Sequence, residues 1–133
     1  MSTFHLKIST PDGLKFDGEV ERLRVRMIDG DLCLLARHAD YVSAVGAGEA
    51  ALVTADGQSR NAACIGGMLA MINNEANLIA TTFEWADEID LDRAKRAKEA
   101  AQARIDAAKD DAQELMLAQA KLQRALIRIN VKH

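Results

Sequence analysis

The positions of glycine and proline constrain the fold of this 133-residue chain more than any other feature. All eight Gly and the only Pro lie at or before Gly67, whereas eleven Ala fall between Ala94 and Ala125. Glycine and proline are the strongest breakers of regular helix, so their absence from Met68 onward allows a long helix there. We therefore expect a β domain over residues 1–86 and a separate helical domain over residues 87–133.

Short β-strands are predicted throughout the first domain. Phe4, Leu6 and Ile8 alternate with polar residues, which is the period-two pattern of a strand with one solvated face. Four Asp-Gly pairs, at 12–13, 17–18, 29–30 and 56–57, separate apolar runs and favour hairpin turns, and Gly66-Gly67 is expected to end a strand before Met68. The apolar run 32–35 predicts a strand covered on both sides. We expect an α+β fold that begins with an antiparallel β-sandwich, or a flattened barrel, of about ten short strands.

The second domain is predicted to be an antiparallel hairpin of two helices. Asp90 is a suitable N-cap for the first helix, and Lys109-Asp110-Asp111 is the predicted turn. Because alanine buries little apolar surface, we expect the hairpin to be only marginally stable and easy to open. Apolar residues recur every three or four positions in two stripes, Leu91, Ala94, Ala97, Ala101, Ile105 and Ala108, then Leu115, Ala118, Leu122, Ala125 and Ile129.

Composition excludes several classes of function. A formal net charge of −3 gives no broad attraction to nucleic acid. No apolar run approaches the roughly 18 residues that a membrane helix needs, so we expect no direct membrane insertion. The first ten residues lack a charged and then apolar leader, so we do not expect export. Cys33 and Cys64 lie in apolar runs, and we interpret them as buried, reduced thiols of a cytosolic protein.

Basic residues late in the chain form the strongest candidate binding surface. Lys121, Arg124, Arg128 and Lys132 are three or four residues apart and therefore share one helical face. No acidic side chain follows Glu114, so this face is either a solvated surface or the binding site of an anionic partner. Arg124 and Arg128 can together hold one phosphate or carboxylate.

The sequence predicts no active site. We interpret Arg22, Arg24 and Arg26 as the solvated face of a strand, with contact to a carboxylate-bearing partner as the alternative. His38 is interpreted as a hydrogen-bonded structural residue in a loop, because a catalytic His needs a nucleophile or a carboxylate placed beside it. The three His have no metal-ligand spacing, and the sequence contains no phosphate-binding glycine loop or nucleophile elbow.

Several short motifs follow one another in a characteristic order. In the first domain they are Ser9-Thr10-Pro11-Asp12-Gly13, Phe16-Asp17-Gly18-Glu19-Val20, Gly30-Asp31-Leu32, Arg37-His38-Ala39, Gly46-Ala47-Gly48 and Gly66-Gly67-Met68-Leu69. In this order and spacing they resemble the epsilon subunit of bacterial F-type ATP synthases. Residues 89–94, Ile-Asp-Leu-Asp-Arg-Ala, fit the family's ATP-binding pattern of Ile or Leu, Asp, two free positions, Arg and Ala. The chain departs from the family at residues 33–36, where Cys-Leu-Leu-Ala replaces Gly-Ile-Leu-Pro, and at Asp40, where Pro is usual.

The resemblance implies a non-catalytic central-stalk subunit, bound peripherally on the cytoplasmic face of the bacterial plasma membrane. Its β-sandwich would bind the gamma subunit and, through Asp31, Arg37 and His38, the membrane ring of c subunits. Its helical hairpin would be folded during catalysis, and would extend along gamma toward the alpha/beta head to inhibit ATP hydrolysis. The basic residues Lys121, Arg124, Arg128 and Lys132 would then contact the catalytic subunit.

The resemblance also implies a regulatory ATP, although no cofactor is required. Asp90 would order the loop that meets the adenine, with Ile89 and Ala94 against the ring. Glu84, Arg93, Arg124 and Arg128 would complete the site, the last two meeting the phosphates. The strongest ATP binders of the family carry another Arg where this chain has Lys98-Glu99-Ala100, so we expect weaker binding. The alternative function is a free-standing ATP-sensing module.

Overall fold

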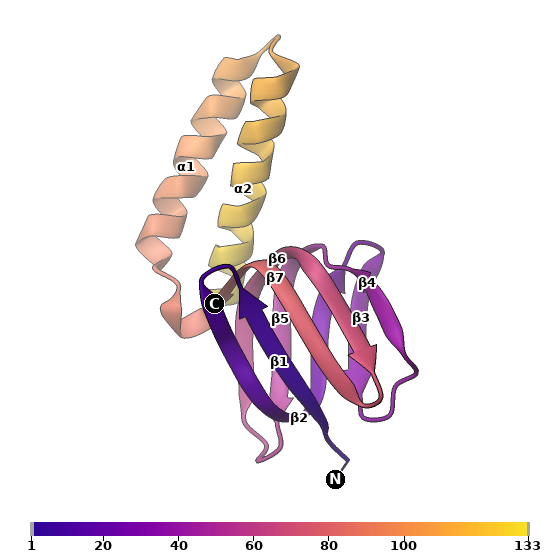
Figure 1. The fold of residues 1–133 in the computed structure, drawn as a ribbon. Coiled ribbons are helices and arrows are strands. Elements are labelled where there is room, and N and C mark those ends of the chain that lie inside the picture. Colours follow the sequence, from indigo (N-terminus) through magenta and orange to yellow (C-terminus); the bar gives the residue numbers. More distant parts are fainter. Residues whose placement is uncertain (1, 133) are drawn as a thin grey trace. The chain divides into compact units, whose positions relative to one another are not determined.

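The computed structural model describes residues 2–132, and the chain divides into two compact units after Trp85. Among the described residues, seven strands form the first unit: β1 Phe4–Thr10, β2 Gly13–Met27, β3 Gly30–Leu35, β4 Tyr41–Ala44, β5 Ala47–Thr54, β6 Ser59–Ile72 and β7 Glu75–Trp85. The second unit contains a short 3₁₀ helix, Ala86–Glu88, and two helices, α1 Leu91–Ala108 and α2 Ala112–Lys132 (Figure 1). The predicted α+β fold is confirmed.

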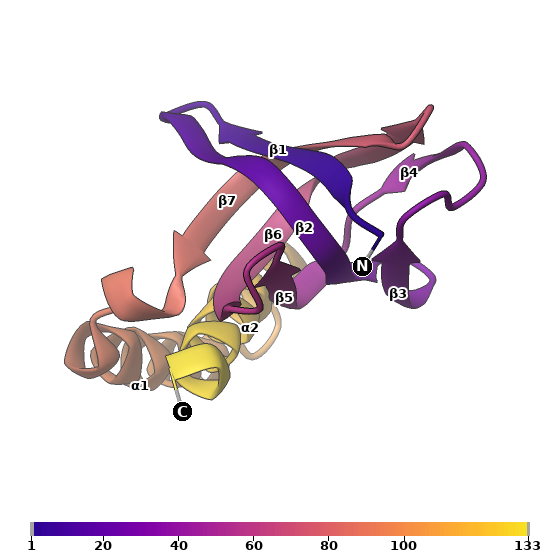
Figure 2. The ribbon, with the colours of Figure 1, turned by 90° about the horizontal axis from the view of Figure 1, so that it is seen from below.

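The strands of the first unit curl around one hydrophobic core. They are hydrogen-bonded in the order β1-β7-β6-β5-β2-β3, and β4 pairs with β6. Because β1 also pairs with β2, five of the strands close into a ring, as Figures 1 and 2 show. The alternating apolar residues of β1 point into this ring, where Phe4, Leu6 and Ile8 are completely buried. The predicted sandwich is therefore also a flattened barrel.

One strand pair departs from the predicted antiparallel arrangement. β1 and β7 run parallel, with His5 opposite Glu75 and Leu6 opposite Ala76. The closed ring contains the five strands β1, β7, β6, β5 and β2. An odd number of strands cannot alternate in direction all the way around a ring, so closure requires a parallel pair.

The prediction of about ten short strands is wrong, because two glycine sites that were expected to end strands lie inside long ones. Gly18 lies within β2, opposite Leu6 of β1. Gly66 and Gly67 lie within β6, at the point where the neighbour of β6 changes from β5 to β4. Gly67 has a φ of +118°, and a Cβ there would lie 2.0 Å from the carbonyl oxygen of Ile79. Glycine here lets the strand bend and approach β7 without ending.

The expected burial of residues 32–35 on both sides is also wrong. β3 pairs with β2 and lies at the end of the strand order. One of its faces packs on the core and the other is solvated, so that Leu34 is buried while Cys33 and Leu35 are exposed. Cys64 is buried as predicted, and its burial raises the pKa of the thiol to about 12.

The arginine side chains of β2 lie on its outer face, as predicted. Leu23 and Val25 between them are buried, whereas Arg22, Arg24 and Arg26 are exposed. The fold also supplies acidic partners that are distant in sequence or lie on the next strand. Arg24 Nη2 donates to Glu49 Oε1 at 3.1 Å, and Arg26 Nη1 lies 3.7 Å from Asp31 Oδ1.

The second unit confirms the predicted cap and turn. The backbone N–H of Arg93 donates to Asp90 Oδ1 at 3.1 Å, which satisfies one of the free amides at the start of α1. The chain reverses at residues 109–111, where Lys109 has a φ of +27°. A positive φ is incompatible with the α-helix, so α1 ends before Lys109.

The contact between α1 and α2 is made mainly by alanine. The buried residues of the two helices, which are described in full, are Ala94, Ala101 and Ala108 of α1 and Ala118, Ala125 and Val131 of α2. Ala97 was predicted on this seam but is exposed. At 100° per residue it lies about 60° around the helix from Ala94, whereas Ala101 lies only about 20° away. The seam therefore follows a seven-residue repeat.

Candidate functional sites

Basic side chains and alanines of the hairpin line a groove of about 320 Å³. Its residues are Ala97, Ala100, Ala101 and Arg104 of α1, and Lys121, Arg124 and Arg128 of α2. The alanines leave room between the helices, and four cations surround that room. None of the lining residues is acidic. This arrangement suits an anion that carries several charges.

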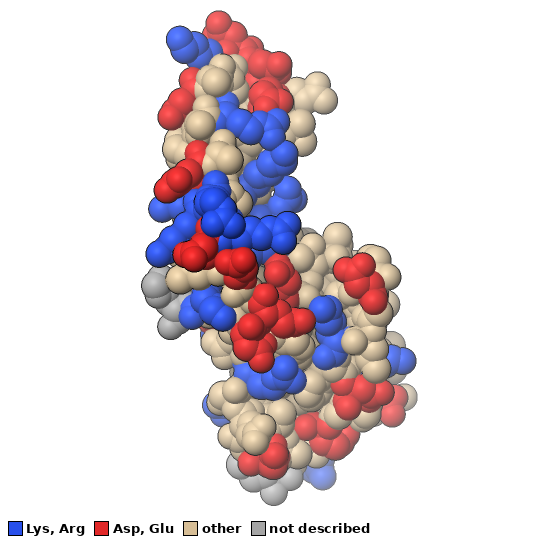
Figure 3. Space-filling model, turned by 90° about the vertical axis from the view of Figure 1, so that its left-hand side faces the viewer, with Lys and Arg blue, Asp and Glu red and all other residues tan. Residues whose placement is uncertain are grey.

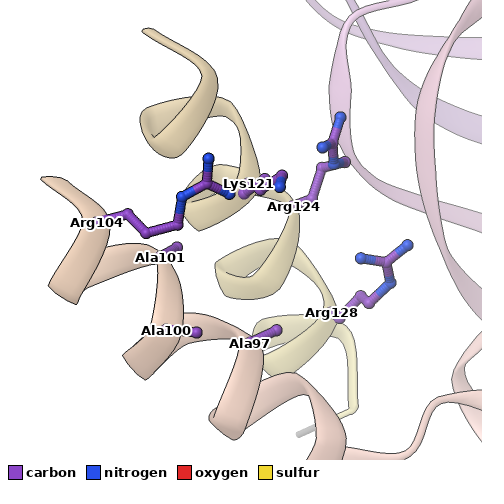
Figure 4. A pocket seen from close by; sticks show the side chains of 7 residues that line it. All are labelled: Ala97, Ala100, Ala101, Arg104, Lys121, Arg124 and Arg128. Carbon is purple, nitrogen blue, oxygen red and sulfur yellow. The ribbon is translucent and has the colours of Figure 1, made fainter. Parts of the chain in front are cut away.

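Figure 4 shows how the charged side chains of the groove are directed. Arg104 extends from α1 toward α2 and ends beside Lys121, whereas the guanidinium groups of Arg124 and Arg128 point away from α1. The predicted basic face is thus present, and three of its four members lie in the groove. The fourth, Lys132, donates from Nζ to the carbonyl oxygen of Ala86 at 3.0 Å.

The charges of the hairpin are unevenly distributed along its length. Lys and Arg cover much of the middle of the hairpin, and Asp and Glu lie around the turn and again near the other end (Figure 3). The acidic residues around the turn are Asp106, Asp110, Asp111 and Glu114, and those at the other end are Asp87, Glu88, Asp90 and Asp92. An anionic ligand is therefore attracted to the middle of the hairpin, where the groove lies.

Arg104 is a groove residue that the sequence analysis missed. Its Nε donates to Glu114 Oε1 at 2.9 Å, and its Nη2 donates to the same oxygen. The predicted turn could have indicated this pair, because Arg104 and Glu114 each lie five residues from Lys109. Folding the two predicted helices about Lys109 places both residues at the same level of the hairpin.

The structure brings together only part of the predicted ATP site. Arg124 and Arg128 line the groove, whereas Ile89 and Ala94 are buried, with 4% of each exposed. Asp90 caps α1, and Arg93 follows it in the first turn of that helix. Glu84 belongs to β7 in the first unit, so its place relative to the groove remains a prediction. An adenine that contacts Ile89 and Ala94 would require those side chains to become exposed.

The residues predicted to contact the membrane ring lie at two ends of β3. Asp31 is the second residue of the strand, and Arg37 follows its last residue by two positions. At about 3.3 Å per residue, the strand from Asp31 to Leu35 spans roughly 13 Å, and Arg37 lies in the turn beyond it. A partner that contacts all three predicted residues must therefore present an extended surface.

Arg37 and His38 are held in a well-defined loop. Arg37 has a φ of +64°, and its N–H donates to the Oδ1 of Asn74 at 2.6 Å. His38 Nδ1 lies 2.7 Å from the carbonyl oxygen of Ala39, and its ring contacts the edge of Tyr41 at a centroid distance of 6.0 Å. These contacts confirm the interpretation of His38 as a hydrogen-bonded loop residue.

The outer surface of β4, β6 and β7 carries an apolar face. It contains Val42, Met68 and Ile79, which are 60%, 46% and 59% exposed, together with Ala44, Ala70 and Ile72. Met68 pairs with both Ala44 and Ile79, so these side chains form a row across three strands. Contiguous exposed apolar side chains mark protein-binding surfaces. This face could not be predicted from the sequence because its residues come from three separate segments.

Two other kinds of site are not found in the described chain. Within residues 2–132, no three His, Cys, Asp or Glu side chains are grouped so as to hold a metal ion. None of the described helices has the length and apolar character needed to cross a membrane.

Both units match family models. Residues 3–86 match the beta-sandwich domain of the ATP synthase delta/epsilon chain, and residues 87–132 match its long alpha-helix domain. Among curated relatives, the ATP synthase epsilon chains of Lacticaseibacillus casei and Clostridium botulinum are 36% and 37% identical. The alignments cover 98% of this chain in both cases, and 94% and 96% of the relatives. The sodium ion specific epsilon chain of Acetobacterium woodii is 38% identical over 77% of each chain.

Solved structures share the fold at low sequence identity. A chain of the mitochondrial ATP synthase of Euglena gracilis superimposes with a TM-score of 0.87 at 17% identity, over 100% of this chain and 83% of that one. A chain from the central stalk and c-ring of the Tetrahymena thermophila enzyme gives a TM-score of 0.65 at 10% identity, over 97% and 96% of the two chains.

Proposed function

Because the chain belongs to the ATP synthase delta/epsilon family, as an epsilon chain, we propose that its two units perform two separate tasks in the central stalk. The β unit connects the gamma subunit to the membrane ring of c subunits. The helical hairpin inhibits ATP hydrolysis by the alpha/beta head. The chain itself is a non-catalytic, peripheral subunit on the cytoplasmic face of the bacterial plasma membrane.

Two surfaces of the β unit support its docking role. The apolar face around Met68 and Ile79 suits the gamma subunit, because burial of exposed apolar side chains stabilises a permanent contact. Asp31 lies near one end of β3, and Arg37 and His38 follow its other end, which is roughly 13 Å away along the strand. A ring of repeated polar loops provides a surface long enough to contact all three.

The packing of the hairpin supports a mobile inhibitory role. Five of the six buried residues in α1 and α2 are alanines. Burial contributes about 0.8 kcal/mol per CH₂ group, so each alanine methyl stabilises the contact by far less than a buried leucine does. The folded and extended hairpins can therefore differ by only a few kcal/mol, and a partner or ligand can select between them.

Regulatory ATP is the ligand proposed for the groove. The observation that carries this proposal is that four cations from both helices surround one space. The space exists only while α1 and α2 are packed together, so ATP would bind the folded hairpin alone. ATP would thereby shift the population toward the folded, non-inhibitory state.

Calorimetry of the full chain with ATP tests this ligand. Replacing Arg124 or Arg128 by Ala should weaken binding by about tenfold or more, the effect of losing a charge-assisted contact of roughly 1.5–3 kcal/mol. Asp90→Ala should weaken it by destabilising the folded hairpin. Lys109→Ala, which removes a cation at the turn, is the control and should change little. If millimolar ATP gives no heat of binding, ATP is not a regulatory ligand of this chain, whereas the proposed stalk function is unaffected.

Co-purification separates the stalk subunit from the alternative of a free-standing ATP sensor. A stalk subunit should be recovered with gamma and the alpha/beta head from solubilised membranes. Recovery of the chain alone, from cells that contain the assembled ATPase, would favour the free-standing sensor.

A further inference from the structure

Arg104 belongs to two groups at once, the cation groove and an ion pair within the hairpin. It lines the groove with Lys121, Arg124 and Arg128, and it donates from Nε to Glu114 Oε1 at 2.9 Å. Its Nη2 donates to the same oxygen. Arg104 is thus a groove cation that already has an anionic partner supplied by the chain.

A stronger anion can displace Glu114 from Arg104. Both side chains are partly solvated, with 41% and 37% of their surfaces exposed, and such pairs contribute little to stability. A phosphate group carries more charge than a carboxylate and accepts hydrogen bonds on more oxygens. Glu114 lies in the first turn of α2, where the helix dipole stabilises its charge after Arg104 has left.

The order of the cations along the groove determines which part of a ligand meets Arg104. Arg128, Arg124 and Lys121 follow one another toward the turn, and Arg128 and Lys121 are about 10 Å apart along the helix axis. Arg104 ends beside Lys121, at the end of the groove nearer the turn (Figure 4). A nucleotide whose base lies near the start of α1 would therefore extend its last phosphate toward Arg104.

We propose that Arg104 binds the terminal phosphate of a nucleoside triphosphate, and that Glu114 is a built-in competitor for Arg104. The pair sets how strongly the groove prefers a triphosphate over a diphosphate, because only the longer chain of phosphates reaches Arg104. This inference rests on the proposed binding of ATP in the groove. It assigns a regulatory role to Glu114, whose carboxylate would release Arg104 when ATP enters.

Calorimetric titration of the full chain with ATP and with ADP tests the pair. Glu114→Gln keeps the size of the side chain but removes the competing charge. It should tighten ATP binding by about two- to fivefold, the range expected for an exposed ion pair, and change ADP binding less. Arg104→Gln should weaken ATP binding and bring it closer to ADP binding. In the double variant, Glu114→Gln should have no further effect on ATP, because the competitor has lost its target.

Matched controls separate competition from changes in net charge or folding. Glu99→Gln removes one negative charge from an exposed position of α1 outside the groove and should leave the ratio of ATP to ADP affinity unchanged. Circular dichroism should show the same helix content in all variants. If wild type binds ATP and Glu114→Gln binds it with the same affinity, the competitor role is wrong while the groove remains an ATP site. Absence of heat in both proteins would overturn both proposals.

Discussion

Lys132 Nζ donates to the carbonyl oxygen of Ala86 across 3.0 Å, and this bond joins the last turn of α2 to the segment that precedes α1. The turn at residues 109–111 already joins the helices at their other ends. The bond from Lys132 therefore closes the open end of the hairpin, where separation of the helices must begin. A cation in the last turn also suits the dipole of α2.

Replacing Lys132 by Met should promote opening of the hairpin. The loss of one hydrogen bond from a charged group at an exposed site is worth about 1 kcal/mol, which would raise the open population by about fivefold. Amide hydrogen exchange of α1 and α2 measures this change. Lys109→Met at the turn is the control, and equal exchange in the two variants would show that the Lys132 bond does not hold the hairpin closed.

The strand β1 should contribute a pH-dependent element of stability through His5. Its Nε2 lies 2.5 Å from Asp17 Oδ1 and its Nδ1 lies 3.1 Å from Glu19 Oε2, while Glu75 is opposite on β7. The hydrogen bond to Asp17 is the main cause of the raised pKa of His5; the bond to Glu19 adds to it, and partial desolvation opposes it. The imidazolium form is therefore favoured in the folded state.

Urea unfolding between pH 6 and pH 8.5 tests this element. The contribution of His5 is fully present below the unfolded pKa of 6.5 and is lost as the pH rises through the higher folded pKa. The midpoint of unfolding of the wild type should fall modestly over this range relative to His5→Gln. Identical pH profiles for wild type and His5→Gln would contradict the assignment.

The basic face should govern inhibition when the hairpin is extended. Replacing Lys121, Arg124, Arg128 and Lys132 together by Ala should weaken inhibition of ATP hydrolysis without unfolding the helices, since Ala is the best helix former. Inhibition by wild type should also fall as salt screens exposed charges. The control replaces four exposed cations elsewhere on the hairpin, Lys95, Arg96, Lys98 and Lys109. An equal loss of inhibition in both quadruple variants would show that the effect depends on net charge alone.

The apolar face should be required for binding to gamma. Ile79→Glu or Met68→Glu would place a charge in the buried centre of that contact and should lower the affinity for isolated gamma by about tenfold or more. Leu14→Glu introduces the same group at another exposed apolar position, outside the face, and should bind normally. Normal binding of all three variants to gamma would exclude this face as the docking surface.

The sequence predicted the local features of the fold more reliably than the pairings between distant segments. The Asp90 cap and the turn at 109–111 depend on neighbouring residues, and both are confirmed. The strand ends predicted at Gly18 and Gly67 are wrong, because glycine permits a bend as readily as a turn and the neighbouring strands decide between them. The exposure of Cys33 likewise depends on which face of β3 the rest of the fold leaves uncovered.

In the candidate sites, too, the sequence predicted contacts between neighbouring residues but not contacts between distant segments. The sequence placed Arg124 and Arg128 on one face because the helical repeat alone does so. Arg104 and Glu114 are ten residues apart and meet only when the hairpin folds about its turn. The apolar face requires the registers of three strands, and the His5 cluster requires the pairing of β1 with β2. Single-sequence periodicity carries no information about these registers.

The ATPase activity of an enzyme assembled with a chain that ends at Ala86 tests the central claim most directly. Both proposed docking surfaces lie in the compact unit that ends at Trp85, so the shortened chain should fold, bind gamma and support ATP synthesis. The same enzyme should hydrolyse ATP faster than one with the full chain, because the inhibitory hairpin is missing. Failure of the shortened chain to assemble, or unchanged ATP hydrolysis in an assembled and coupled enzyme, would contradict the proposed division of tasks.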